Sequence, residues 1–145
     1  MSDKYFIDTN IFVYSLDTDE PEKASVAEKL ITAGASTGLG AISYQVVQEF
    51  FNVALRKSTR KMPQEDAQRY LSEVLCPLVA AQSPQELYAA AIRLYHRYGF
   101  SWYDSVIVAA AIEAGCRVLL TEDLQDGMDV EGLRIENPFK DVGPS

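Results

Sequence analysis

The sequence predicts an α/β fold, a three-layer α/β/α sandwich with a central, mostly parallel sheet. Short apolar stretches typical of buried strands alternate along the chain with longer stretches in which apolar residues recur at helical spacing. Alternation in this order favours parallel strand pairs that are covered by helices on both faces. The chain has 145 residues, of which 48% are hydrophobic, so we expect residues 1–145 to form one domain around one core.

The first part of the chain predicts a strand, a helix and a second strand. The first strand is expected over residues 4–8, and the same apolar and aromatic character continues over residues 11–14 as an extension of it. A helix is expected to begin near Pro21, because proline is favoured in a first helical turn, and to end at Gly34. A short second strand follows over residues 39–42.

Two helices are predicted in the middle of the chain. Ser43 is suited to cap the first of them, whose apolar stripe continues to residue 55. Pro63 is expected to open the second helix and Pro77 to close it. A weak strand signal follows over residues 78–81.

The last part of the chain contains the clearest helix start. The segment Ser83-Pro84-Gln85-Glu86 matches a capping box with proline at the first helical position, and this helix is expected to end at Gly99. Residues 101–104 open another helix, which is apolar nearly all round as far as Gly115 and should therefore be buried. The remaining strands are expected over residues 117–121 and 133–135.

The composition excludes several classes of function. The chain has 21 acidic and 13 basic residues and a net charge of -8, which argues against extensive electrostatic wrapping of nucleic acid. Only Cys76 and Cys116 are present and they lie far apart, so neither a disulfide framework nor a zinc site is supported. The longest apolar run, over residues 106–112, is too short to span a membrane. We therefore expect a cytoplasmic protein with reduced thiols.

Four acidic residues lie at positions that one edge of the predicted sheet would bring together. Asp8 and Asp123 follow strands, whereas Glu49 and Asp104 lie near the starts of helices. The ligand crevice of an open α/β sheet lies beyond the carboxyl ends of its strands, where the following helices begin. Two carboxylates 4 Å apart repel each other by about 4 kcal/mol at an effective dielectric near 20. Mg²⁺ or Mn²⁺ would relieve this repulsion, so the pattern predicts metal-dependent chemistry on phosphate.

Taken singly, three of these acids also have a simpler explanation. Asp104 and Ser101 fit a capping box, Glu49 fits the polar side of its helix, and Asp123 fits a polar turn. Asp8 fits a simple structural explanation least well, because an ionised group beside a buried strand is costly unless it is paired. The four acids in this order are therefore more informative than any one of them.

Four segments of the sequence resemble the four-acid pattern of PIN-domain nucleases. They are Phe6-Ile7-Asp8-Thr9-Asn10, Glu49 in the helix after Ser43, Trp102-Tyr103-Asp104-Ser105, and Leu120-Thr121-Glu122-Asp123-Leu124. The length and layout are most similar to VapC-like toxins of type II toxin–antitoxin modules. This resemblance implies a Mg²⁺- or Mn²⁺-dependent endoribonuclease that cleaves RNA, forms a homodimer and is restrained by a cognate antitoxin.

The resemblance also implies a role for each residue of the pattern. Asp8 and Asp104 would be metal ligands, Glu49 a ligand or a base, and Asp123 the acid that completes the site. Asn10 and Thr121 would orient these carboxylates or the attacking water.

The fourth acidic position is ambiguous. Many relatives have a second acid there with an aromatic residue after it, whereas this chain has Asp126-Gly127. Asp123 and Asp126 therefore compete for the role.

Three other functions stay open from the residues alone. A catalytically degenerate PIN-fold module that binds proteins is one, although all four acids are intact. A receiver-like phosphoacceptor needs an early acidic pair and a late lysine, but no lysine follows Val118 until Lys140. A haloacid-dehalogenase-like phosphatase needs an Asp-x-Asp motif, and here the third position is Asn10.

Two further features could contact RNA. The basic cluster of Arg56, Lys57, Arg60 and Lys61 either binds phosphates or complements the dipole of its helix. Trp102 and Tyr103 either stack on a base or pack in the core beside the crevice. His96 is the only histidine, which excludes a two-histidine acid–base mechanism.

Overall fold

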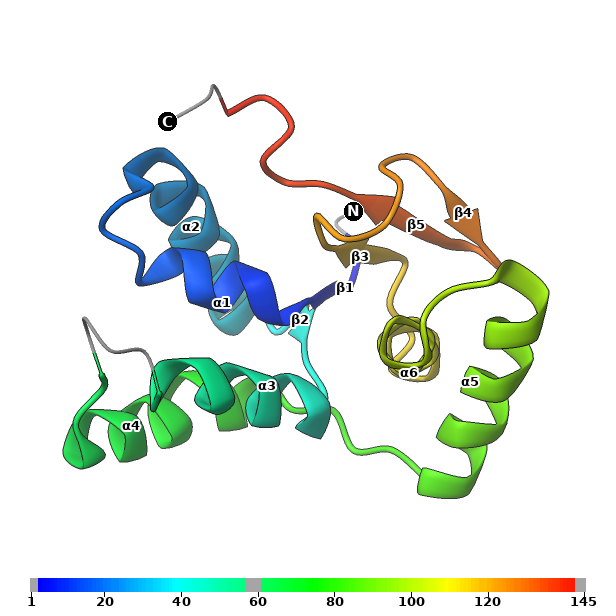
Figure 1. The fold of residues 1–145 in the computed structure, drawn as a ribbon, viewed down its shortest axis with the longest axis horizontal. Helices are drawn as coiled ribbons and strands as arrows, with labels where there is room; N and C mark the ends of the chain where they lie inside the picture. The colour runs from blue at the N-terminus through cyan, green and yellow to red at the C-terminus, as the bar shows by residue number, and fades with distance from the viewer. Residues whose placement is uncertain (1–2, 57–60, 143–145) are drawn as a thin grey trace.

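The computed structural model describes residues 3–56 and 61–142, and within them a five-stranded sheet forms the centre of the molecule (Figure 1). The strands are β1 (Tyr5–Ile7), β2 (Gly40–Ala41), β3 (Val118–Leu120), β4 (Asp129–Val130) and β5 (Leu133–Glu136). Their order is β2-β1-β3-β5-β4, and every pair is parallel except β4 with β5. The predicted mostly parallel sheet is therefore confirmed.

Helices cover the sheet on both sides. They are α1 (Thr9–Ser15), α2 (Pro21–Thr37), α3 (Tyr44–Ala54), α4 (Gln64–Tyr70), α5 (Pro84–Tyr98) and α6 (Trp102–Glu113). In Figure 1, α1 and α2 lie on one side of the strands and α5 and α6 on the other, while α3 and α4 run along the bottom of the view. The predicted three-layer arrangement is thus present.

The core consists of the central strands and the inward faces of the surrounding helices, of which α6 contributes the most buried residues. Phe6 and Ile7 of β1 and Leu119 of β3 are fully buried, and residues 105–111 of α6 are buried as well. The prediction that this helix is apolar all round and buried is confirmed. Burial of one such helix and two parallel strands removes enough apolar surface from water to hold the edge of the sheet in place.

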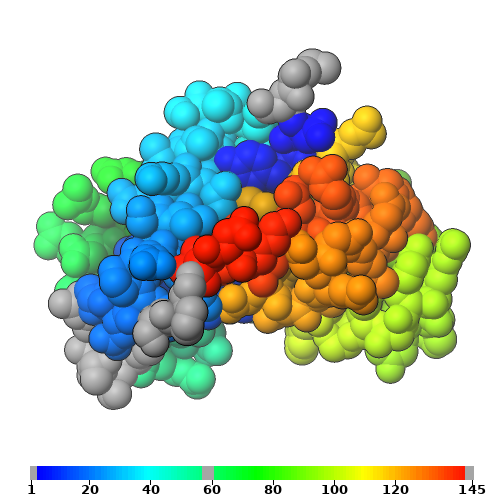
Figure 2. Space-filling view, turned by 90° about the horizontal axis from the view of Figure 1, so that it is seen from above, coloured from blue at the N-terminus to red at the C-terminus, as the bar shows by residue number. Residues whose placement is uncertain are grey.

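The C-terminal segment after β5 lies between two parts of the molecule. Figure 2 shows it in red between the blue residues of α1 and α2 and the orange β4–β5 hairpin. Phe139 is buried there, and its ring packs edge-on against Tyr14 at 5.0 Å between centroids. Lys23 lies over the Tyr14 ring and pairs with Glu122, and the hydroxyl of Tyr14 donates a hydrogen bond to Glu122. These contacts hold the segment after β3 against α1 and α2.

The prediction that residues 11–14 extend the first strand is wrong, because these residues form helix α1. Asp8 accepts a hydrogen bond from the backbone N–H of Thr9 and thereby caps the helix. Ile11 and Phe12 are buried on the side of α1 that faces the core. A short apolar run does not by itself distinguish a strand from a buried helix.

The predicted end of α2 at Gly34 is also wrong, because the helix continues to Thr37 and ends at Gly38 in the left-handed conformation with φ 74°. Gly34 instead lets α2 approach β2 closely. A Cβ atom on Gly40 would lie 2.8 Å from the Cα atom of Gly34, so neither position has room for a side chain. The glycine is a packing residue inside the helix.

Several smaller expectations differ from the structure. The weak strand over residues 78–81 is reduced to one bridge between Val79 and Ile42, and β4 was not predicted at all. Ser43 and Ser83 occupy N-cap positions, but neither side chain makes the capping hydrogen bond. The helix expected between Pro63 and Pro77 changes after α4 into a π turn, η1 (Leu71–Leu75), and a 3-10 turn, η2 (Cys76–Leu78).

Three further features of the sequence can be compared with the structure. Lys57 and Arg60 of the predicted basic cluster lie outside the described residues. Cys76 and Cys116 are both free thiols. No helix in the described ranges is long and apolar enough to cross a membrane.

We predict that Gly40→Ala destabilises the protein by about 1–3 kcal/mol, the usual cost of overpacking a close contact. The backbone of Gly34 would have to move to accept the methyl group, because it leaves no free space for a Cβ atom. Urea unfolding of the variant and the wild type measures the difference. Equal unfolding midpoints would contradict the prediction.

Candidate active site

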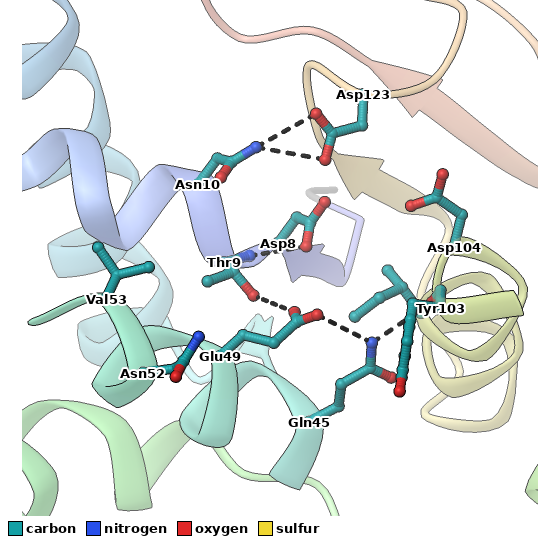
Figure 3. Close-up of a pocket in the computed structure, with 11 residues that line it drawn as sticks. Asp8, Thr9, Asn10, Gln45, Glu49, Asn52, Val53, Tyr103, Asp104 and Asp123 are labelled. Carbon is teal, nitrogen blue, oxygen red and sulfur yellow. Dashed lines mark hydrogen bonds between the residues drawn. The ribbon is translucent and has the colours of Figure 1, made fainter. Parts of the chain in front are cut away.

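A pocket of about 270 Å³ opens at the edge of the sheet where β1 and β3 end (Figure 3). It lies at the start of α1 and of α6 and beside α3. Its lining residues are Asp8, Thr9, Asn10, Gln45, Glu49, Asn52, Val53, Tyr103, Asp104, Ile107 and Asp123. The ligand crevice of a parallel sheet is expected at this edge.

All four acids of the main sequence prediction line this pocket, and each comes from a different element. Asp8 joins β1 to α1, Glu49 lies on α3, and Asp104 lies in the first turn of α6. Asp123 lies in the segment that follows β3. In Figure 3 the four carboxylates surround one space. The topology thus brings together acids that are far apart in the sequence.

Asp8 is the most buried of these acids, with 6% of its surface exposed. One carboxylate oxygen accepts the backbone N–H of Thr9 at 2.7 Å, and the other accepts the hydroxyl of Thr121 at 2.8 Å. These bonds compensate only part of the cost of burying a charge. The pKa of Asp8 is therefore raised to about 6, mainly by burial; the two hydrogen bonds lower it, and the charges of Asp123 and Glu49 raise it.

Glu49 accepts hydrogen bonds from two residues of the pocket, one on helix α1 and one on its own helix α3. The Thr9 hydroxyl donates to one Glu49 oxygen at 2.6 Å, and the Gln45 amide donates to the other at 3.3 Å. The same amide donates to the backbone carbonyl of Tyr103 at 3.4 Å, which links α3 to α6. Sequence reasoning missed Thr9 and Gln45. Gln45 lies one helical turn before Glu49, and this spacing is the signal that would have identified it.

Asp123 is oriented by residues that the sequence predicted as orienting groups. The amide of Asn10 donates to both oxygens of Asp123 at 3.2 Å. The backbone N–H of Asp123 donates to the Thr121 hydroxyl at 3.1 Å, so Thr121 connects Asp123 to Asp8. Partial burial raises the pKa of Asp123, and the charges of Asp104, Glu122 and Glu49 add to this effect.

Asp126, the competing residue for the fourth position, does not line the pocket. One of its oxygens accepts the backbone N–H of Asn137 at 2.8 Å, and the other lies 3.5 Å from the ammonium of Lys140. The hydrogen bond from Asn137 lowers the pKa of Asp126, with a smaller contribution from Lys140. Asp126 therefore fixes the turn before β4 and points away from the acids.

The two aromatic residues before Asp104 do not pack in the core. Tyr103 is 66% exposed and lines the pocket. Trp102 is 37% exposed, and its ring stacks on Tyr88 at 6.3 Å between centroids. The alternative that both rings are tucked into the core is therefore wrong.

The pocket has the donor chemistry of a site for a hard divalent cation but is not assembled as one. Its lining includes four carboxylates and the side-chain amides of Asn10, Gln45 and Asn52, and none of the described Lys and Arg residues lines it. Oxygen donors of this kind suit Mg²⁺ or Mn²⁺. Yet within residues 3–56 and 61–142, no group of three or more His, Cys, Asp and Glu side chains is arranged to hold a metal ion. The acids line the walls of the pocket without converging on one point.

We predict that Asp8 makes the metal-free protein less stable as the pH rises. Its pKa in the folded state, about 6, lies above its ordinary value of 3.8, so the folded protein binds a proton that the unfolded chain releases between these values. This contribution to stability is complete below pH 4 and is lost as the pH rises through 6, by up to about 3 kcal/mol. Asp8→Asn should remove it.

Urea unfolding of wild type and Asp8→Asn in a chelating buffer at several pH values measures this contribution. The variant should be more stable than the wild type above pH 6, and the difference should shrink towards pH 4. A difference that is constant over this range would contradict the assignment of the raised pKa to Asp8.

Comparison with known proteins identifies the family. The family model of the PIN domain matches residues 5–125 of the chain. No curated protein sequence matches it.

Solved structures give the same fold. A toxin–antitoxin complex from Klebsiella pneumoniae is 20% identical with a TM-score of 0.64, and the match covers 92% of this chain and 97% of that one. FitAcB from Neisseria gonorrhoeae is 18% identical with a TM-score of 0.61, covering 94% and 99%. VapBC2 from Rickettsia felis, bound to a DNA fragment from its promoter, is 21% identical with a TM-score of 0.61, covering 92% and 97%. At these identities the matches show a shared fold.

Proposed function

The chain belongs to the PIN domain family, and on that premise we propose that it is a metal-dependent endoribonuclease and the toxin of a toxin–antitoxin pair. The observation that carries the proposal is that four carboxylates from four separate segments line one pocket, with no Lys or Arg among its described lining residues. Mutual repulsion of this kind destabilises a fold unless a cation offsets it. An acid cluster at the ligand-binding edge of a parallel sheet thus supports a site that works with a bound divalent ion.

In this proposal Mg²⁺ or Mn²⁺ is held by Asp8 and Asp104, with Glu49 and Asp123 completing the site. When bound, such an ion polarises a phosphodiester oxygen and lowers the pKa of water, so hydrolysis needs no covalent intermediate. The raised pKa of Asp8 and of Asp123 supports the assignment, because a nearby cation would favour the charged form of both acids.

The neighbouring polar side chains would position these acids. The hydrogen bonds from Thr9 and Thr121 leave Asp8 one fixed orientation, and Asn10 does the same for Asp123. Glu49 accepts a hydrogen bond at each oxygen, from Thr9 and Gln45, which keeps its carboxylate turned towards the pocket as a ligand or as a base for water. Such supporting bonds are as important to a metal site as the ligands themselves.

The proposed partners are a cognate antitoxin and a second copy of the chain, in the cytoplasm. Solved structures with this fold are toxin–antitoxin complexes, which supports an antitoxin as partner. Helix α5 exposes Tyr88, Ile92 and Tyr95, at 49%, 52% and 44% of their surfaces. Because these residues recur at helical spacing, they form one apolar stripe suited to a protein contact such as a homodimer interface.

We predict that Asp8→Asn and Asp104→Asn each lower the rate of RNA cleavage by roughly 100-fold or more. Loss of a group that only supports a metal ligand costs up to about 100-fold, and loss of a ligand should cost at least as much. Calorimetry with Mn²⁺ should show binding to the wild type and much weaker binding to both variants. Asp66→Asn, which changes an exposed acid in the first turn of α4, is the matched control and should cleave like the wild type.

Full activity of either pocket variant at saturating Mn²⁺ would contradict the mechanism. A wild-type protein that neither binds Mn²⁺ nor cleaves RNA would favour a degenerate module that only binds proteins. Phosphorylation of Asp8 by a phosphate donor would favour the phosphoacceptor alternative.

We predict that Asp123 and not Asp126 is the fourth acid. Asp123→Asn should lower cleavage by roughly 10-fold or more and weaken Mn²⁺ binding. Asp126→Asn should leave both close to the wild type, because its carboxylate bonds to Asn137 and Lys140 outside the pocket. Measuring both variants side by side decides the question, and the reverse order of effects would overturn the assignment.

A further inference from the structure

Tyr103 presents an unusually open aromatic ring at the mouth of the acid pocket. It is 66% exposed and lines the pocket next to Asp104. Within residues 3–56 and 61–142, no other aromatic ring packs against it, whereas the neighbouring Trp102 already stacks on Tyr88. A large exposed ring beside a functional pocket is a surface on which a ligand can stack.

The backbone that carries this ring is held firmly. The Tyr103 carbonyl accepts the Gln45 amide, and Ser101 caps α6 by accepting the backbone N–H of Asp104 at 3.1 Å. From Ser105 onward the helix is buried in the core. Figure 3 shows Tyr103 between α6 and Gln45, beside the space that the acids surround. The ring is therefore presented by a rigid element, so ordering it on binding costs little conformational entropy.

The charge of the protein indicates how much of the affinity for RNA has to come from this ring. The chain carries -8, and within residues 3–56 and 61–142 no Lys or Arg lines the pocket, so these residues contribute little phosphate neutralisation to RNA affinity there. Proteins that bind single strands combine basic grooves with aromatic rings on which bases stack, and stacking needs no positive charge. A pocket that lacks the basic part depends more on the aromatic part.

Building on the function proposed above, we propose that Tyr103 is the stacking platform for an unpaired base of the bound RNA, adjacent to the cleaved phosphodiester. Bases in a duplex are stacked on each other and do not offer a free face, so the platform selects single-stranded RNA. Every base has an aromatic face, so stacking here gives affinity with little sequence preference. Tyr103 is in this sense a substrate-binding residue and not a metal ligand.

The test uses the full chain with an Asp8→Asn background, which prevents cleavage, and a single-stranded RNA that contains 2-aminopurine. The fluorescence of this base falls when it stacks on a ring. We expect quenching with Tyr103 and with Tyr103→Phe, loss of quenching with Tyr103→Ala, and roughly 5- to 100-fold weaker binding for Tyr103→Ala. Tyr44→Ala is the matched control, because Tyr44 is also 66% exposed but does not line the pocket.

Several outcomes would overturn the platform. Equal quenching and affinity for Tyr103→Ala would do so, as would an equal loss with Tyr44→Ala, or binding of duplex RNA as tight as binding of the single strand. Sedimentation of both tyrosine variants is included, because dissociation of a dimer by Tyr103→Ala would show that a second copy covers the ring. Cleavage by the otherwise wild-type chain is measured separately. Cleavage without Tyr103-dependent quenching rejects the platform alone, whereas quenching without cleavage rejects the proposed nuclease.

Discussion

Asp8 is the residue on which the arrangement of the pocket depends. Its backbone N–H donates to the carbonyl of Leu120 at the end of β3, and its side chain accepts the hydroxyl of Thr121 and the N–H of Thr9. One residue therefore ties the ends of two parallel strands together and starts helix α1. Thr121 also accepts the backbone N–H of Asp123, so the contact between Asp8 and Thr121 helps to fix the position of Asp123. Burial makes this anchor costly, and the raised pKa of Asp8 reflects that cost.

The wider structure follows from two neighbouring constraints. Helix α1 begins directly after β1, so Thr9 and Asn10 reach Glu49 and Asp123 on opposite sides of the pocket. Strands β1 and β3 have only three residues each. Short strands are enough to build the pocket, because its polar groups follow the ends of the strands. Apolar residues of α6 and of the strands are buried in the core, whereas the polar residues of the pocket lie at one edge of the sheet. Asp8 is the exception, because it belongs to the pocket and also joins the ends of β1 and β3.

Much of this arrangement could be predicted from the sequence, because strand and helix periods alternate clearly and acids stand at the predicted strand ends. The failures have physical causes. Residues 11–14 are apolar in a way that suits a strand or a buried helix, and in the structure they form a helix that Asp8 caps. Thr9 contacts Glu49 from another helix, which no local pattern encodes, whereas Gln45 lies one helical turn before Glu49 and could have been identified from that spacing. The contacts of Asp126 could not be predicted either, because they come from Asn137 and Lys140, which follow it only after the β4–β5 hairpin.

The contact between Gly34 and Gly40 has a consequence far from where it occurs. Strand β2 leads within a few residues into α3, the helix that carries Glu49 and Gln45. The thickness of the α2–β2 contact therefore sets the starting point of α3, and through it the reach of Glu49 towards Thr9. Two residues without side chains thus help to position the helix that carries Glu49, although neither of them lines the pocket.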